Sequence, residues 1–201
     1  MVVLQGSTIN NLVSAFELYY RDESEAGADR QYTAHIRLVE GQDILEWEVR
    51  LNGIEVSEDG LEVMAQWKLK DMKNDGIFYT DSNCLEMQKR RLDWRPDFDL
   101  KTISKMSSNF YPIDSAIALR DVNSSLQMTV MNDRSQGGSS LEDGSVVLTH
   151  NRACVADDHK GLEEVLDERD RTSIAFDKFQ SEMNKLRTPD MGIQVNAKYF
   201  I

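Results

Sequence analysis

The 201-residue sequence is poor in cysteine: it contains only Cys84 and Cys154, which form no CxxC pair. Two thiols are too few for a disulfide scaffold and too sparse for a cysteine-based zinc site. They are therefore interpreted as two free thiols or as a single bridge. The sequence also lacks an apolar run of the length that crosses a bilayer, so we do not expect an integral membrane protein.

Basic residues are also scarce. Lysine and arginine number 23 against 35 aspartates and glutamates, which gives a formal net charge of −12 and a pI of about 4.7. The densest basic cluster, at Lys89, Arg90, Arg91 and Arg95, is surrounded by acidic residues. Such a surface repels the phosphate backbone, so no nucleic-acid partner is predicted.

The first residues, MVVLQGSTINNL, have neither a positively charged region nor an apolar core. They match neither a signal peptide nor a transit peptide. This leaves two interpretations, a cytosolic protein or an internal piece of a longer chain.

The common catalytic motifs are missing as well. The three histidines, His35, His150 and His159, stand in no HxH, HxD or HExxH arrangement, and no GxSxG or phosphate-loop sequence occurs. Metal hydrolysis and nucleophilic serine chemistry need such convergent groups. Acidic pairs such as Asp97 with Asp99 are interpreted as solvated surface residues. The sequence predicts no metal site and no catalytic residue within this chain.

Alternation of apolar and polar residues is the strongest positive signal. Residues 45–51 and 61–69 show this alternation most clearly, which is typical of half-buried strands. Weaker alternation predicts further strands at 32–39, 116–120, 126–131, 146–150 and 193–200, and a short apolar run after a turn predicts one at 77–79. Turn sequences rich in glycine and asparagine separate them. The pattern predicts an all-β sandwich or barrel.

Two segments depart from this pattern. Apolar residues in Thr172–Leu186 recur at helical spacing before Pro189, so we predict a short amphipathic helix there. The charged segment Gly161–Arg171 is interpreted as a surface helix or a solvated linker. The polar residues Thr80–Asn83 are interpreted as a structural turn after a strand, or as an ordered loop at an interface.

Several motifs together resemble the C-terminal β region of glycoside hydrolase family 38 α-mannosidases, most of all the lysosomal acid branch. In chain order they are GIFYTDSNCLEMQKRRLDWRPDF, NFYP, MTVMNDRSQGGSSLEDGSVVLTHNR and ADDHKG. The resemblance runs from about Leu45 to Gly161, with a later strand near Gly192–Phe200. It departs from the family at Cys84, where glycine is usual, and at Ala153, where the second arginine of a pair is usual.

The resemblance implies a supersandwich-like (galactose mutarotase-like) antiparallel β-sandwich with the helical insertion named above. It implies one C-terminal domain over residues 1–201, with the catalytic N-terminal domain, its zinc and its carboxylates outside this chain. The implied partners are that catalytic domain and mannose-containing glycans. The implied location of the full-length protein is lysosomal or vacuolar. We also expect self-association of the isolated piece, because a missing domain leaves an apolar patch.

The resemblance also suggests which residues reach the rim of the sugar site. The RSQGGSS segment reads as a shaped loop whose glycines permit close backbone approach, and an arginine further on offers bidentate hydrogen bonds. An ion pair between that arginine and Asp157 or Asp158 is the alternative. The candidate substrate-binding residues are Arg134, Gln136, Gly137, Gly138, Ser139, Arg152, Asp157 and Asp158.

Two rival functions are a free-standing carbohydrate-binding module and a protein-interaction domain. The first requires exposed aromatic side chains on one sheet face, whereas Trp47 and Trp67 occupy apparent core positions. The sequence Asn123-Ser124-Ser125 matches the acceptor for N-glycosylation, which is relevant only in a secreted or lysosomal protein.

Overall fold

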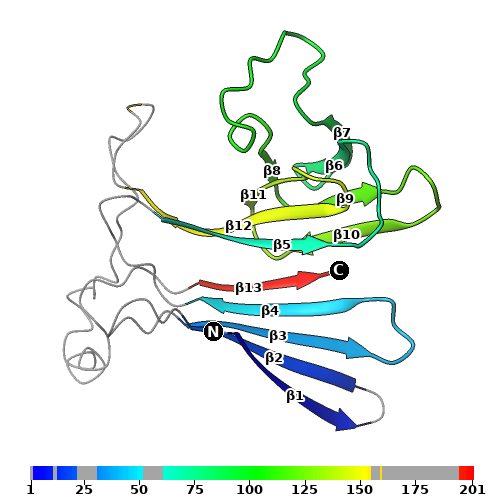
Figure 1. Ribbon diagram of the computed structural model, residues 1–201, viewed down its shortest axis with the longest axis vertical. Helices are drawn as coiled ribbons and strands as arrows, with labels where there is room; N and C mark the ends of the chain where they lie inside the picture. Colours follow the sequence, from blue (N-terminus) through cyan, green and yellow to red (C-terminus); the bar gives the residue numbers. More distant parts are fainter. Residues whose placement is uncertain (1, 11–12, 22–30, 52–60, 155–158, 160–194) are drawn as a thin grey trace.

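A computed structural model describes residues 2–10, 13–21, 31–51, 61–154, 159 and 195–201. These residues form thirteen strands in two antiparallel sheets (Figure 1). The nine-stranded sheet contains, in spatial order, β1 (Val2–Asn10), β2 (Val13–Arg21), β3 (Gln31–Val39), β4 (Leu45–Leu51), β13 (Val195–Phe200), β10 (Gln127–Asn132), β9 (Ala116–Arg120), β6 (Ile77–Ser82) and β7 (Glu86–Arg91). The four-stranded sheet contains β5 (Leu61–Lys68), β12 (Ser145–Ala153), β11 (Gln136–Ser139) and β8 (Tyr111–Ile113).

The core lies where the four-stranded sheet packs on the large one. β12 contacts β13 and β9, and β8 contacts β6. Across the gap, the Trp67 ring meets Trp47 and Tyr199 edge to face, with ring centroids 5.9 and 4.9 Å apart. Such aromatic pairs add to the stabilisation that burial alone gives. The antiparallel β-sandwich predicted from alternation and resemblance is confirmed.

The predicted strands are found with small shifts at their ends. Residues 45–51 form β4, residues 116–120 form β9, and the alternating run from Leu61 ends at Lys68 in β5. Strands β1, β2, β7, β8 and β11 were not predicted. The expected helix Thr172–Leu186 and the segment Gly161–Arg171 lie outside the described residues.

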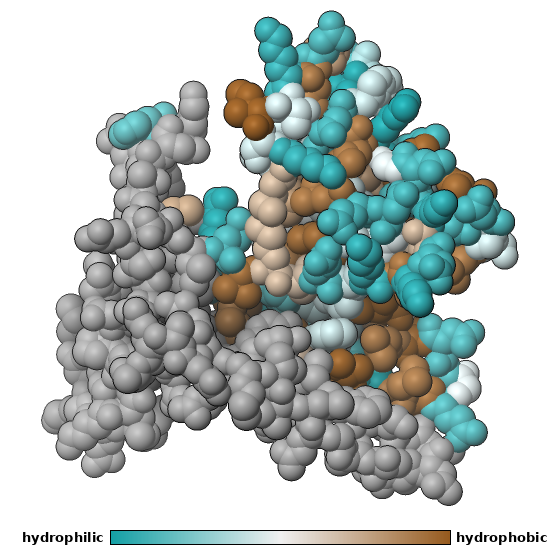
Figure 2. All heavy atoms as spheres, viewed as in Figure 1, coloured by the Kyte–Doolittle hydropathy of each residue, from teal (hydrophilic) through white to brown (hydrophobic). Residues whose placement is uncertain are grey.

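The two tryptophans contribute to this core as predicted. Trp67 is buried, and Trp47 is half-buried and packs against the core cluster. Neither belongs to an exposed aromatic platform, which is the feature that a free-standing carbohydrate-binding module requires. On the face shown in Figure 2, hydrophilic residues predominate over the part that contains β6–β10, with smaller apolar areas between them.

The Asp81 side chain links the end of β6 to the residues at the start of β9 by hydrogen bonds. The strand continues through Ser82, so Asp81 lies within it rather than after it, and its side chain is 4% exposed. Asp81 Oδ1 accepts hydrogen bonds from the backbone amides of Asp114, Ser115 and Ala116 at 2.9–3.2 Å, and Oδ2 accepts one from Cys84 N at 2.9 Å. The strand is three residues longer than predicted, so of residues 80–83 only Asn83 lies in the structural turn, which spans residues 83–85.

The turn after Asp81 explains why glycine suits position 84. Asn83 and Cys84 have φ of 50° and 59°, the left-handed region that costs an L residue about 1–2 kcal/mol. Both Cys84 and Cys154 are free thiols, as one of the two interpretations held.

We expect Cys84→Gly to raise the free energy of unfolding by about 0.5–1 kcal/mol, because relief of the left-handed strain exceeds the entropy that glycine adds to the unfolded chain. Urea unfolding measures the change. Cys84→Ser is the matched control, since it removes the thiol but keeps a side chain on a left-handed backbone. An equal gain from serine would refute the backbone explanation.

Candidate functional site

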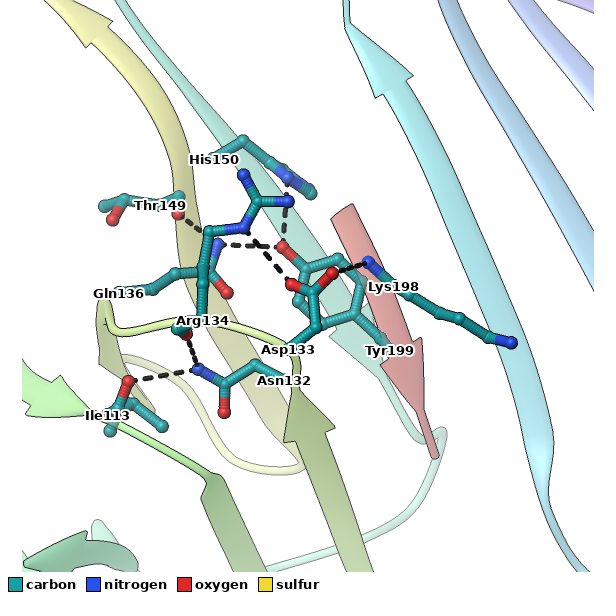
Figure 3. Close-up of polar contacts among 9 residues, drawn as sticks. All are labelled: Ile113, Asn132, Asp133, Arg134, Gln136, Thr149, His150, Lys198 and Tyr199. Atoms are coloured by element: carbon teal, nitrogen blue, oxygen red, sulfur yellow. Dashed lines mark hydrogen bonds and ion pairs between the residues drawn. The ribbon is translucent and has the colours of Figure 1, made fainter. Parts of the chain in front are cut away.

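A group of polar residues lies where the end of β10 meets β11, β12 and β13 (Figure 3). We call it the Tyr199 cluster. Its members are Asn132, Asp133, Arg134, Gln136, Thr149, His150, Lys198 and Tyr199. It contains Arg134 and Gln136, two of the residues that the sequence suggests for the rim of a sugar site.

Tyr199 is the centre of the cluster. Its side chain is fully buried, and its hydroxyl lies 2.8 Å from Gln136 Nε2 and 3.0 Å from His150 Nδ1. Gln136 Nε2 donates to the hydroxyl oxygen and to the carbonyl oxygen of Thr149. Because Tyr199 belongs to the large sheet and the others to the small one, these hydrogen bonds join the two sheets.

His150 is a buried, neutral member of this network. Burial is the main reason that its pKa falls to about 4, and the positive charge of Arg134 lowers it further while Asp133 opposes the shift. Figure 3 shows the Arg134 side chain extending toward His150. The imidazole therefore stays uncharged at neutral and mildly acidic pH, where it can accept the Tyr199 hydroxyl proton in a hydrogen bond.

Asp133 fixes the position of Arg134. Its Oδ1 accepts a hydrogen bond from Arg134 Nε at 3.2 Å, and its Oδ2 accepts one from the Lys198 backbone amide at 3.0 Å. The Asn132 side-chain amide donates to the carbonyl oxygens of Ile113 and Arg134. The backbone around Arg134 is thus tied to β13 and β8, while about a third of the Arg134 side chain is exposed.

The middle of the RSQGGSS segment is a strand rather than part of the predicted loop. Gln136–Ser139 form β11, with Gly138 paired both to Leu148 of β12 and to Tyr111 of β8. The loop interpretation was wrong for these residues. The glycines have no side chains to pack, but β8 and β12 lie on either side and pair with their backbone, which holds the segment as a strand. Ser139 is buried, and among the described residues its hydroxyl has no hydrogen-bond partner.

The glycines do permit close approach, but to the core. A Cβ on Gly138 would lie 2.8 Å from Ile113 Cγ1 and closer still to Leu148 Cδ2, and both side chains are fully buried. We expect Gly138→Ala to lower the free energy of unfolding by about 2 kcal/mol through overpacking. Gly41→Ala is the control for loss of glycine in general, since a Cβ there meets no atom within 4 Å.

Chemical denaturation of both variants measures the difference. The Gly41 variant also places alanine at a φ of 77°, so a modest loss is expected there from strain alone. An unchanged midpoint for Gly138→Ala would show that Leu148 and Ile113 can move aside.

The remaining predicted residues are spread along β12 and beyond. Arg152 is exposed near the end of β12, two positions after His150 and paired in register with Glu62 of β5. Asp157 and Asp158 lie outside the described residues, so the predicted ion pair with Arg152 is not tested. Of the six candidates within the described residues, Arg134 and Gln136 join the Tyr199 cluster through their side chains. The backbone amide of Gly137 also donates a hydrogen bond to Thr149 Oγ1 of this cluster.

Sequence reasoning missed His150 and Tyr199 as members of the site. A signal was present: His150 continues the inward positions of Val146 and Leu148, and Tyr199 continues those of Val195 and Ala197. A polar side chain at an inward position of a strand is either paired or functional.

The described residues contain no group of three or more His, Cys, Asp or Glu side chains that fits a metal ion. The zinc that the resemblance implies belongs to the catalytic domain, outside this chain, so no chemical step is assigned to a metal here. No helix among the described residues is long and apolar enough to span a membrane. The Tyr199 cluster can hold the two sheets together and present Arg134 at the surface.

Comparison with known proteins gives a consistent result. The family described as the C-terminal domain of family 38 glycosyl hydrolases matches residues 2–160. A lysosomal α-mannosidase from Mus musculus is 43% identical over 136 residues, which is 67% of this chain and 13% of that protein. The Felis catus protein of the same name is 37% identical over 164 residues, which is 81% of this chain and 16% of that protein. The Homo sapiens protein is 41% identical over 132 residues, 65% of this chain and 13% of its length.

Proposed function

Because this chain belongs to family 38 of the glycosyl hydrolases, in their C-terminal domain, we propose that it is the non-catalytic β domain of an α-mannosidase. In the full-length enzyme it supports the catalytic domain and shapes the rim of the mannoside site. The catalytic domain, with its zinc, hydrolyses terminal α-mannosides in glycans. The matched region makes up 13–16% of the relatives' length, which leaves ample chain for such a domain.

The family match over residues 2–160 carries this proposal. It covers every strand of the two sheets except β13, which lies after the matched residues. The chain's own residues hold neighbouring strands in place and supply the positive charge of Arg134. The hydrogen bonds around Tyr199 and Asp133 hold β10, β11 and β13 in place, and this framework presents Arg134.

We propose that Arg134 and Arg152 make the rim contacts with sugar or with the catalytic domain. Arg134 is partly exposed and Arg152 is exposed. Gln136, Gly137, Gly138 and Ser139 belong to β11, so their part is to set the path of that strand. Asp157 and Asp158 follow Arg152 and are proposed to orient it.

The first experiment separates support from catalysis. Hydrolysis of p-nitrophenyl α-mannoside is measured with added zinc, by the 201-residue chain and by the full-length protein that contains it. Turnover by the full-length protein alone supports the proposal. Turnover by the 201 residues would overturn it.

Arg152→Ala in the full-length enzyme tests the rim contact. Loss of a charge-assisted hydrogen bond of about 1.5 kcal/mol predicts a roughly tenfold fall in kcat/KM, expressed mainly in KM. Arg50→Ala, an exposed arginine on β4 whose partner is Glu48, is the matched control and should keep wild-type kinetics. Equal kinetics for both variants would remove Arg152 from the site.

The segment between β7 and β8 is proposed as part of the contact with the catalytic domain. It exposes four large apolar side chains, with Ile103 98% exposed. The other three are Trp94, Phe98 and Met106. In the isolated chain such surface favours self-association, so light scattering should give a dimer mass; a monomer would count against this contact.

The same relatives are named as lysosomal proteins, so we propose a lysosomal or vacuolar location for the full-length protein. Immunofluorescence of the full-length protein with a lysosomal marker tests this directly. A diffuse cytosolic signal would contradict it.

A further inference from the structure

The turn that joins β9 to β10 carries the sequence Asn123-Ser124-Ser125. It is the only Asn-x-Ser/Thr sequence among the 201 residues. The turn spans residues 121–126 and forms the tip of a hairpin on the large sheet, at the far end of β9 and β10 from Asn132 (Figure 1). Acceptor sites for N-linked glycans need such exposed surface positions.

The turn is held by Asp121 rather than by the asparagine. Asp121 Oδ2 accepts hydrogen bonds from Ser124 Oγ at 2.6 Å and from Asn123 N at 3.3 Å, while Oδ1 accepts one from Lys73 N at 2.8 Å. The Asp121 amide donates to the carbonyl oxygen of Leu126 at 2.9 Å and closes the hairpin. The shape of the tip is therefore independent of the Asn123 side chain.

The two side chains that an acceptor site uses are accessible. Asn123 and Ser125 are both exposed, and within the described chain no hydrogen bond involves the Asn123 amide group or the Ser125 hydroxyl. Ser124, between them, points its hydroxyl to Asp121. The asparagine nitrogen and the serine hydroxyl at the third position are thus left for a transferase to engage.

A second observation concerns what surrounds Asn123. Val122 and Leu126 are 52% and 51% exposed in the same turn. Two large apolar side chains at an exposed hairpin tip favour association with other surfaces. The apolar faces of the first sugars of a glycan on Asn123 would cover them.

We propose that Asn123 is an N-glycosylation site whose glycan shields Val122 and Leu126. The inference rests on the proposed lysosomal route, because the donor is an oligosaccharide on a polyprenyl pyrophosphate in the secretory lumen. The Asn123 side-chain nitrogen forms a bond to the anomeric carbon of the first sugar. The bond from that carbon to the pyrophosphate oxygen breaks, its electron pair leaves with the pyrophosphate, and the amide loses one proton to a base.

The test uses the full-length protein from its own cells or a eukaryotic host. The peptide that contains Asn123 is analysed by mass spectrometry after release of N-glycans in heavy-oxygen water, which converts a glycosylated asparagine to labelled aspartate. We expect the label at Asn123 in wild type and in Ser125→Thr, and its complete loss in Ser125→Ala. No described side-chain hydrogen bond is removed by either substitution, so the fold is preserved.

Location is measured separately, by protection of the protein from added protease in intact vesicles. A protected protein with unlabelled Asn123 would overturn this inference and leave the proposed function standing. A protein digested without detergent and unlabelled would overturn both the inference and the lysosomal route.

The shielding of Val122 and Leu126 by the glycan is tested by a separate measurement. Enzymatic removal of the glycan should increase self-association in light scattering, and the variant Val122→Ser/Leu126→Ser should show no such increase. If removal of the glycan leaves association unchanged in wild type, the shielding part of the proposal fails.

Discussion

Replacing Asp81 by alanine is expected to lower the free energy of unfolding by about 4 kcal/mol, because it leaves backbone amides of two chain segments without their charged acceptor. The amides are those of Cys84 and of residues 114–116, and Asp81 is 4% exposed. Hydrogen bonds to a carboxylate are stronger than those between neutral groups. Urea unfolding followed by circular dichroism measures the loss.

Asp81→Asn is the informative comparison. It keeps an oxygen toward the amides of Asp114, Ser115 and Ala116 but turns an NH2 group toward Cys84 N, so it should lose less than alanine does. Equal losses in the two variants would mean that packing, and not the acceptor, accounts for the effect.

The stability that Asp81 contributes depends on pH. Burial alone would raise the pKa of Asp81, but the backbone amides of Ser115, Cys84, Ala116 and Asp114 together hold it below its usual value. A carboxylate with a lowered pKa stabilises the fold above the unfolded pKa of about 3.9, and this stabilisation is lost as pH falls through the folded pKa. Asp81→Asn should lack that loss.

The second large effect concerns His150. Its folded pKa of about 4 lies below the unfolded value near 6.5, so the unfolded chain binds a proton first as pH falls. The stability that neutral His150 allows is complete above pH 6.5 and is lost progressively down to about pH 4. A shift of this size corresponds to about 3 kcal/mol.

His150→Asn isolates this contribution. The asparagine oxygen can replace Nδ1 as the acceptor of the Tyr199 hydroxyl, and asparagine does not titrate. We expect the variant to be less stable at pH 7.5 but to lose about 3 kcal/mol less than wild type between pH 7.5 and 4. A wild-type slope in His150→Asn would show that other groups set the pH dependence.

Strands with one buried face could be predicted from the sequence, and others could not. Alternation identified β4 and β5 because their inward residues are apolar and their outward residues are mostly charged or polar. β7, with the sequence EMQKRR, gives no such signal because it is an edge strand with a charged surface. β11 gives none because Gly137 and Gly138 have no side chains to alternate.

The candidate site was predictable only where a family motif marked it. Arg134 and Gln136 stand in the RSQGGSS motif, and both belong to the Tyr199 cluster. Tyr199 lies 63 positions from Gln136, and only the pairing of β13 with β10 brings it near. Long-range pairing of this kind is not encoded in local periodicity.

The position of β13 has a consequence for how the chain folds. β13 lies between β4 and β10, and its residue Val195 pairs with Leu51, 144 positions earlier. Contacts at such separation close slowly, because the entropy of a long loop must be overcome before pairing begins. During synthesis the edges of β4 and β10 that pair with β13 therefore have no partner strand until residues 195–200 emerge from the ribosome. For that interval each unpaired edge can pair with another nascent chain. A chaperone that covers strand edges would prevent this pairing at β4 and β10.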